Sequence, residues 1–120
     1  MNYIKILTVT NETDVVLLRM LVRDLAGTIG LVLADQARIS LAAWSVAKAI
    51  GLCSTHRGQV TIKDCCHNER IGVRVVCTSE SGRTDLTPNA LGDARWMVDQ
   101  LTVETLPSKN VQVTLVKWRA

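Results

Sequence analysis

The stretch "ISLAAWSVAKAI", residues Ile39–Ile50, decides how the rest of the chain is interpreted. Its polar side chains are Ser40, Ser45 and Lys48, so the stretch is apolar almost all the way round. A helix of this composition is normally buried, because it has no polar face to turn toward water. The sequence therefore predicts a helix that lies between neighbouring elements, and core packing alone would explain its composition.

The residues before this stretch indicate a strand and a first helix. "YIKILTVT", residues 3–10, alternates and is rich in β-forming residues, which is typical of a strand. "NETD" then supplies an N-cap from Asn11, Thr13 or Asp14. A helical apolar stripe predicts a helix over residues 14–30, ended by Gly30, and the second helix covers residues 34–51, closed by Gly51.

The residues after the second helix indicate four strands and a third helix. Strands are expected at residues 59–64 and 71–77, joined as a hairpin by the polar "HNER". A polar loop leads to a helix over residues 90–101, and strand-like "LTVETL" and "VQVTLVKW" close the chain. The order β-α-α-β-β-α-β-β predicts an α+β fold, a two-layer α/β sandwich. We expect a mixed, mostly antiparallel sheet with three helices on one face and a half-polar, exposed second face.

Length and composition favour one domain over residues 1–120. Of the 120 residues, 48% are hydrophobic and 21% are charged, which is ordinary for a globular protein with its own core. The net charge of +3 comes from scattered residues without a basic stripe, so we expect no nucleic-acid partner. No run reaches the ~18 apolar residues of a membrane helix. The N-terminus does not read as a signal peptide, and we therefore expect a cytoplasmic location.

The cysteines and histidines raise the question of a metal site. Cys53 and His56 form one cluster, and Cys65, Cys66 and His67 form another. The intervening "RGQVTIKD" alternates like a strand, which separates the clusters by roughly 17–20 Å. A tetrahedral zinc ion needs every ligand within ~2.3 Å. We therefore expect no metal site, and reduced cysteines that act as small hydrophobic residues.

Four segments of the chain form a recognisable layout: "ADQARISLAAWSVAKAIGL" after a helix that ends in glycine, the hairpin, "RWMVDQLTVET" at residues 95–105 and "LVKW" at residues 115–118. With this layout the chain resembles, over nearly its whole length, the gyrase, heat-shock-protein and histidine-kinase (GHKL) ATPase superfamily. Within it, the resemblance is to bacterial anti-sigma-factor and stressosome switch serine kinases. The resemblance implies a histidine-kinase-like ATPase fold.

The motifs that carry nucleotide chemistry in that family are degenerate in this sequence. The resemblance places a general-base Glu and a magnesium-binding Asn at positions occupied here by Ser45 and Ala49. The family's adenine-binding Asp-x-Gly-x-Gly motif falls on "TSESG", where Thr78 or Ser79 takes the Asp position and Gly82 is the one glycine. "TPNALGDAR" keeps only Gly92 of a glycine-rich lid, and the lid is therefore expected to be short or missing.

These losses imply a pseudokinase without a catalytic residue. The resemblance implies a non-catalytic partner-switching module in bacterial signal transduction, with no cofactor. Its expected partners are an anti-sigma antagonist, a sigma factor or a phosphatase, and a homodimer is a further expectation. Two alternatives stay open. One is an ATP- and magnesium-dependent protein serine kinase with divergent ligands. The other is a small-molecule sensor that uses the vacated pocket near Ser45, Ala49 and Thr78.

Overall fold

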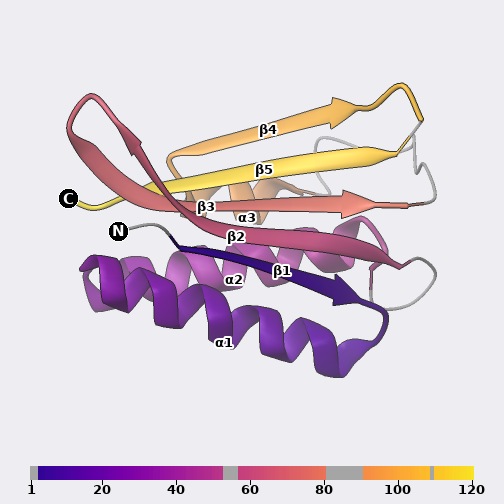
Figure 1. The fold of residues 1–120 in the computed structure, drawn as a ribbon, viewed down its shortest axis with the longest axis horizontal. Helices are drawn as coiled ribbons and strands as arrows, with labels where there is room; N and C mark the ends of the chain where they lie inside the picture. Colours follow the sequence, from indigo (N-terminus) through magenta and orange to yellow (C-terminus); the bar gives the residue numbers. More distant parts are fainter. Residues whose placement is uncertain (1–2, 53–56, 81–90, 109) are drawn as a thin grey trace.

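The structure is a computed structural model that describes residues 3–52, 57–80, 91–108 and 110–120. In chain order its elements are β1 (Ile4–Val9), α1 (Glu12–Ile29), α2 (Leu33–Ala49), β2 (Gly58–His67), β3 (Arg70–Ser79), α3 (Gly92–Met97), β4 (Gln100–Thr105) and β5 (Val111–Trp118) (Figure 1). This is the element order that the sequence predicts.

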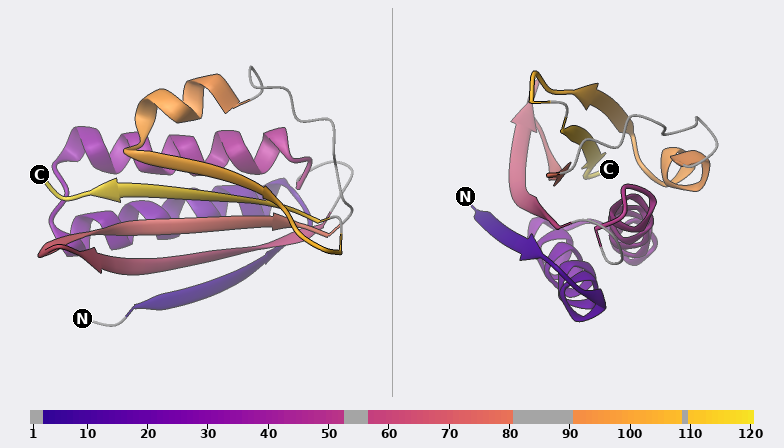
Figure 2. Two further views of the ribbon diagram at one scale, coloured as in Figure 1. Left: turned by 90° about the horizontal axis from the view of Figure 1, so that it is seen from above. Right: turned by 90° about the vertical axis from the view of Figure 1, so that its right-hand side faces the viewer.

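The strands form one five-stranded sheet in the order β1-β2-β3-β5-β4, and the three helices lie on one of its faces (Figure 2). The two-layer α+β sandwich is therefore confirmed. Every pair of neighbouring strands among the described residues is antiparallel, although a mixed sheet was expected. The reason is that β5 inserts between β3 and β4 and pairs with both. The two strands joined through α3 thus never become neighbours.

Both long helices end in the same way, at an Ile-Gly-Leu sequence. Gly30 and Gly51 adopt positive φ angles of 101° and 82°, a conformation that costs glycine little. The amide of the following Leu31 donates to the Ala26 carbonyl, and that of Leu52 donates to the Ala47 carbonyl. Both leucines are buried. This combination is the Schellman motif, which satisfies the last helical carbonyls and turns the chain into the core.

The core lies between α1 and α2 and the inward face of the sheet. The helices contribute residues at the predicted helical spacing, and each strand contributes alternate residues, because successive strand side chains point to opposite faces. Asn11 caps α1 by accepting from the Asp14 amide at 3.0 Å. The fully buried side chains with the largest volumes are Leu18, Leu25, Ile39, Ile50, Leu52, Ile62 and Leu115.

The hairpin of β2 and β3 is longer than predicted. The ladder reaches the pair His67 and Arg70, so only Asn68 and Glu69 form the turn, not the whole of "HNER". Both turn residues have positive φ, 51° and 67°, as the right-handed twist of a two-residue hairpin requires. The polar composition of "HNER" therefore marked the end of the strands too early.

The third helix is shorter than predicted and ends at Met97 rather than near residue 101. Val98 is already extended. Asp99 is hydrogen-bonded to β5 through both its backbone amide and its side chain. Its amide donates to the Val116 carbonyl at 2.9 Å, and its carboxylate accepts the Trp118 amide at 2.7 Å. These long-range bonds start the edge strand β4 where local helical spacing would continue α3.

The outward face of the sheet is half polar, as predicted, but two of its large apolar residues near the end of β5 are covered. Val116 is buried and Trp118 is only 7% exposed, because the curled hairpin covers the ring. The Arg70 guanidinium lies 4.8 Å from the centre of that ring, and the His67 ring lies 6.5 Å from it. The exposed apolar side chains on this face are instead Ile4 and Ile6 of β1.

We expect Leu18→Ala to lower the free energy of unfolding by about 2–5 kcal/mol, because this side chain is fully buried between α1 and the sheet. The adjacent Leu17 is 39% exposed, and Leu17→Ala is the matched control, with an expected cost of about 1 kcal/mol or less. Urea unfolding measures both. Equal costs for the two variants would show that the inward face of α1 is misassigned.

We expect Glu69→Gly to stabilise the protein by roughly 0.5–1 kcal/mol, because a left-handed conformation strains a residue with a β-carbon more than it strains glycine. Asn68→Gly should change stability little, since asparagine tolerates this conformation. Thermal and chemical unfolding of the two variants provide the comparison. A loss of stability in Glu69→Gly would contradict the turn geometry described here.

Candidate functional site

The two positions that the resemblance assigns to catalysis, Ser45 and Ala49, lie four residues apart on the same side of α2. They follow Arg38 by 7 and 11 residues, so all three share one helical stripe. The opposite side of α2 faces α1, because Ser40 and Trp44 line hollows with α1 residues. Ser45 and Ala49 are half-buried. The helix thus places them together, but the serine hydroxyl does not act as a base at neutral pH and the alanine side chain has no atom that binds a metal ion.

The one acidic residue of α2, Asp35, is engaged elsewhere. Its carboxylate accepts from Arg38 Nη1 at 2.8 Å and lies 3.6 Å from Lys117 Nζ of β5. The same ammonium group lies 3.4 Å from Asp99. The side chains of Asp35 and Lys117 are only 13% and 15% exposed, so this network joins α2 to the sheet in a partly dry environment. Asp35 therefore serves the fold and does not stand in for the missing base.

The two residues proposed for the adenine-binding position, Thr78 and Ser79, face opposite sides of the sheet. Ser79 is fully buried on the helix side, and its Oγ has no hydrogen-bond partner among the described residues. Thr78 Oγ1 donates to Gln112 Oε1 at 3.4 Å on the outward side. Thr78 therefore cannot share a pocket with Ser45 and Ala49 on the helix side of the sheet.

The remaining site residues concern the lid. Gly92 begins α3, and a β-carbon added to it would meet nothing within 4 Å, so no close backbone approach requires glycine there. Gly82 and the short or missing lid fall outside the described residues. Glu80, next to Ser79 in sequence, is exposed and its carboxylate lies 3.3 Å from Arg57 Nε.

The described cysteines differ in burial. Cys77 is buried in the core, Cys65 is half-buried and Cys66 is exposed. Burial raises the pKa of Cys65 above its ordinary value, although Arg74 opposes the shift. Cys53 and His56 lie outside the described residues. Among the residues that the structure does describe, no three His, Cys, Asp or Glu side chains are grouped so that they could hold a metal ion.

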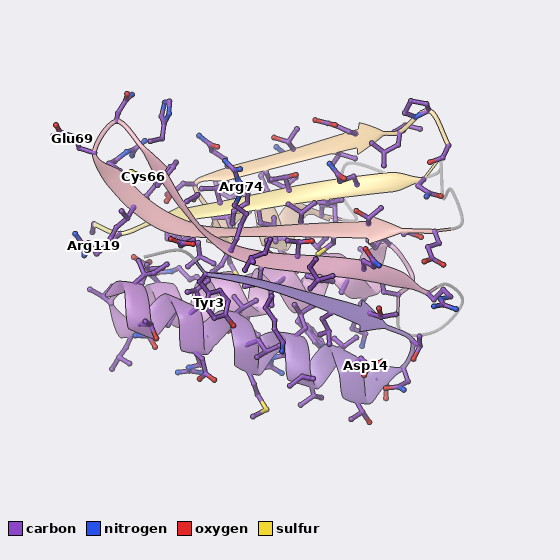
Figure 3. All side chains as sticks on the ribbon, viewed as in Figure 1. Tyr3, Asp14, Cys66, Glu69, Arg74 and Arg119 are labelled. Carbon is purple, nitrogen blue, oxygen red and sulfur yellow. The ribbon has the colours of Figure 1, made fainter. Side chains whose placement is uncertain are left out.

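A cavity of about 490 Å³ lies at the end of the molecule where α1 finishes. Arg119, just after β5, borders it and donates to two carbonyls: its amide to Ile71 at 2.8 Å and its Nη1 to Ile29 at 3.2 Å. Figure 3 shows Cys66 and Arg119 at this end of the molecule. The sequence offered no signal for this cavity beyond the cysteine pair. Its lining residues are Thr28, Ile29, Asp64, Cys65, Cys66, Ile71 and Arg119.

A second surface that sequence reasoning missed lies between the solvent-exposed sides of α1 and α2. We call it the α1–α2 groove. It holds two hollows of about 160 and 150 Å³, and both are bordered by Val16. Its other residues are Glu12, Val15, Arg19, Met20 and Arg23 of α1 and Ser40, Trp44 and Lys48 of α2. The one signal in the sequence was Trp44, in a helix that has no other aromatic residue.

The burial of Cys77 makes stability depend on pH in a way that can be measured. Burial raises the pKa of its thiol from 9.0 to about 12, so the folded protein keeps the thiol proton while the unfolded chain loses it. Stability is therefore fully present below pH 9 and falls as the pH rises toward 12. We expect wild type to lose stability relative to Cys77→Ala across this range. A pH-independent difference between the two proteins would contradict this account.

The described helices include none that is both long and apolar enough to cross a membrane. No protein-family model matches this chain, and a search of curated proteins finds no significant match.

Proposed function

We propose that the chain is a non-catalytic protein-interaction module of the partner-switching type in bacterial signalling. In this proposal it derives from a histidine-kinase-like ATPase domain that has lost its nucleotide site. The single observation that supports the proposal most strongly is the pair Ser45 and Ala49, which share one side of a helix but offer no base and no metal ligand.

Phosphoryl transfer from ATP depends on positioning and on charge stabilisation by magnesium. Magnesium requires oxygen ligands in near-octahedral geometry, and the methyl group of Ala49 supplies none. A serine hydroxyl in the base position does not accept a proton near neutral pH. Asp35, the one acidic residue of α2, does not compensate for these losses, because it is bound to Arg38 and Lys117 and lies almost three helical turns before Ser45.

The adenine-binding position supports the same proposal. Ser79 is the candidate that faces the helices, and it is 0% exposed. Its side-chain oxygen is one bond closer to the backbone than the carboxylate oxygens of an aspartate. The exposed Glu80 is paired with Arg57 instead of facing the core. Losing the base alone would cost about 10²–10⁴-fold in rate, and weaker adenine binding would add to that loss.

The surface of the domain carries exposed apolar side chains that suit protein partners. Exposed apolar side chains occur on α1, at Val16 and Met20, and on the edge strand β1, at Ile4 and Ile6. From the resemblance, we propose that the partner is an anti-sigma antagonist, a sigma factor or a phosphatase, and that the chain can also bind a second copy of itself.

The proposal predicts that millimolar ATP and magnesium leave the melting temperature unchanged and produce no binding heat. A ligand at 100 times its dissociation constant would stabilise the fold by about 2.7 kcal/mol, which thermal-shift and calorimetric titrations readily detect. The double variant Ser45→Glu with Ala49→Asn should not restore binding, because the adenine position and the glycine-rich lid motif remain altered.

A clear thermal shift with ATP and magnesium, abolished by Ser79→Ala, would instead favour the divergent serine kinase. ATP-dependent phosphorylation of a serine in a partner would establish that alternative. Saturable binding of a different small molecule, weakened by Ala49→Leu, would favour the sensor. Each of these results would overturn the non-catalytic interaction module as the primary function.

A further inference from the structure

We propose that the α1–α2 groove binds an acidic amphipathic helix of a partner protein. This inference rests on the proposed function and specifies the surface and the chemistry of the partner. Three features of the groove carry it: its shape, its exposed apolar side chains and its uncompensated positive charge.

The shape of the groove matches the spacing of a helix. One hollow lies between Val16, Arg19, Met20, Arg23 and Ser40, and the next between Glu12, Val15, Val16, Trp44 and Lys48. The α2 residues that border them follow one another at four-residue intervals, a rise of ~6 Å each. Side chains at positions i and i+4 of a docked helix have the same rise. Two neighbouring hollows along one groove therefore suit two successive apolar anchors.

Two apolar side chains of the groove are exposed, whereas those on the inward side of α1 are buried. Val16 is 54% exposed and Met20 is 58% exposed. Met20 borders the first hollow and Val16 borders both. A methionine side chain adapts to partners of different shape. Covering these two residues requires apolar side chains from the occupant, which a helix with an apolar face supplies and a sugar-phosphate backbone does not.

The charge of the groove selects an acidic occupant. Arg19, Arg23 and Lys48 border it, against the single carboxylate of Glu12. None of these three cations makes an ion pair among the described residues. The lining thus carries a net charge of +2, three bases less one acid, in a chain whose total is +3. Complementary charge across an interface raises the association rate and suppresses wrong partners.

Trp44 holds two of these cations in place. The Arg19 guanidinium lies 5.7 Å from the centre of its ring, and the Lys48 ammonium group lies 4.6 Å from it. Both attractions are favourable, but two like charges on one ring repel each other, and an anion between them would relieve that repulsion. Because the side chains are already positioned, a carboxylate on the partner loses less binding energy to ordering them.

The first test places a photo-crosslinking amino acid at Met20, in the groove, or at Trp96, which is 88% exposed on α3, as a matched control. The full chain is expressed in its native cell, and crosslinked segments are identified by mass spectrometry. We expect adducts at Met20 to map to a segment with apolar residues at helical spacing flanked by Asp and Glu. Adducts to nucleic acid, or to a basic or non-helical segment, would overturn the proposal, as would the absence of any adduct.

The second test measures the affinity of a synthetic peptide of that segment by fluorescence anisotropy. We expect the charge reversals Arg19→Glu and Lys48→Glu together to weaken binding tenfold or more, and added salt to weaken binding to wild type. Arg95→Glu, a charge reversal at an exposed site on α3, should leave the affinity unchanged. Circular dichroism confirms that each variant is folded. Equal affinities for all variants would rule out the groove.

The outcomes separate this inference from the proposed function. Partner adducts at Trp96 but not at Met20 would overturn docking in the groove and leave the interaction module standing. An ATP-dependent thermal shift would overturn the non-catalytic function whatever the groove binds.

Discussion

The burial of α2 against the sheet is the interaction on which the rest of the structure depends. Ile39, Ala42, Ala43 and Val46 are fully buried, and the small alanines allow the helix to approach the strands closely. With α2 in that position, α1 and α3 pack along its two sides on the same face of the sheet (Figure 2). The side of α2 toward α1 then forms one wall of the groove, and the opposite side carries Ser45 and Ala49.

In the function that we propose, this arrangement would let a nucleotide site be lost without loss of the fold. Ser45 and Ala49 are half-buried, and a Glu and an Asn in these positions would have to be desolvated or hydrogen-bonded. Replacing such groups by small side chains commonly raises stability while removing activity. Besides its apolar contacts, α2 is linked to the sheet by the ion pair between Asp35 and Lys117, which also lies close to Asp99.

The two layers also differ in what they offer a partner. On the outward face of the sheet, the hairpin covers Trp118 with Arg70 and His67, so the aromatic ring is withdrawn from solvent. On the helical layer, Trp44 holds Arg19 and Lys48 beside two open hollows. Both tryptophans have two basic neighbours, but only Trp44 lies in a concave, partly apolar surface. A docked helix therefore fits the helical layer better than the outward face of the sheet.

The sequence by itself determined the order of the elements, the inward stripe of α1 and the central position of α2. These features depend on the spacing of apolar residues and on Gly30 and Gly51, which are local properties of the chain. The placement of Ser45 and Ala49 on one side of α2 was predictable for the same reason, since it follows from helical spacing. The end of α3, the burial of Trp118 and the α1–α2 groove followed from the tertiary structure alone. Each of these depends on contacts between residues far apart in the chain, such as Asp99 with the Trp118 amide, which no local pattern encodes.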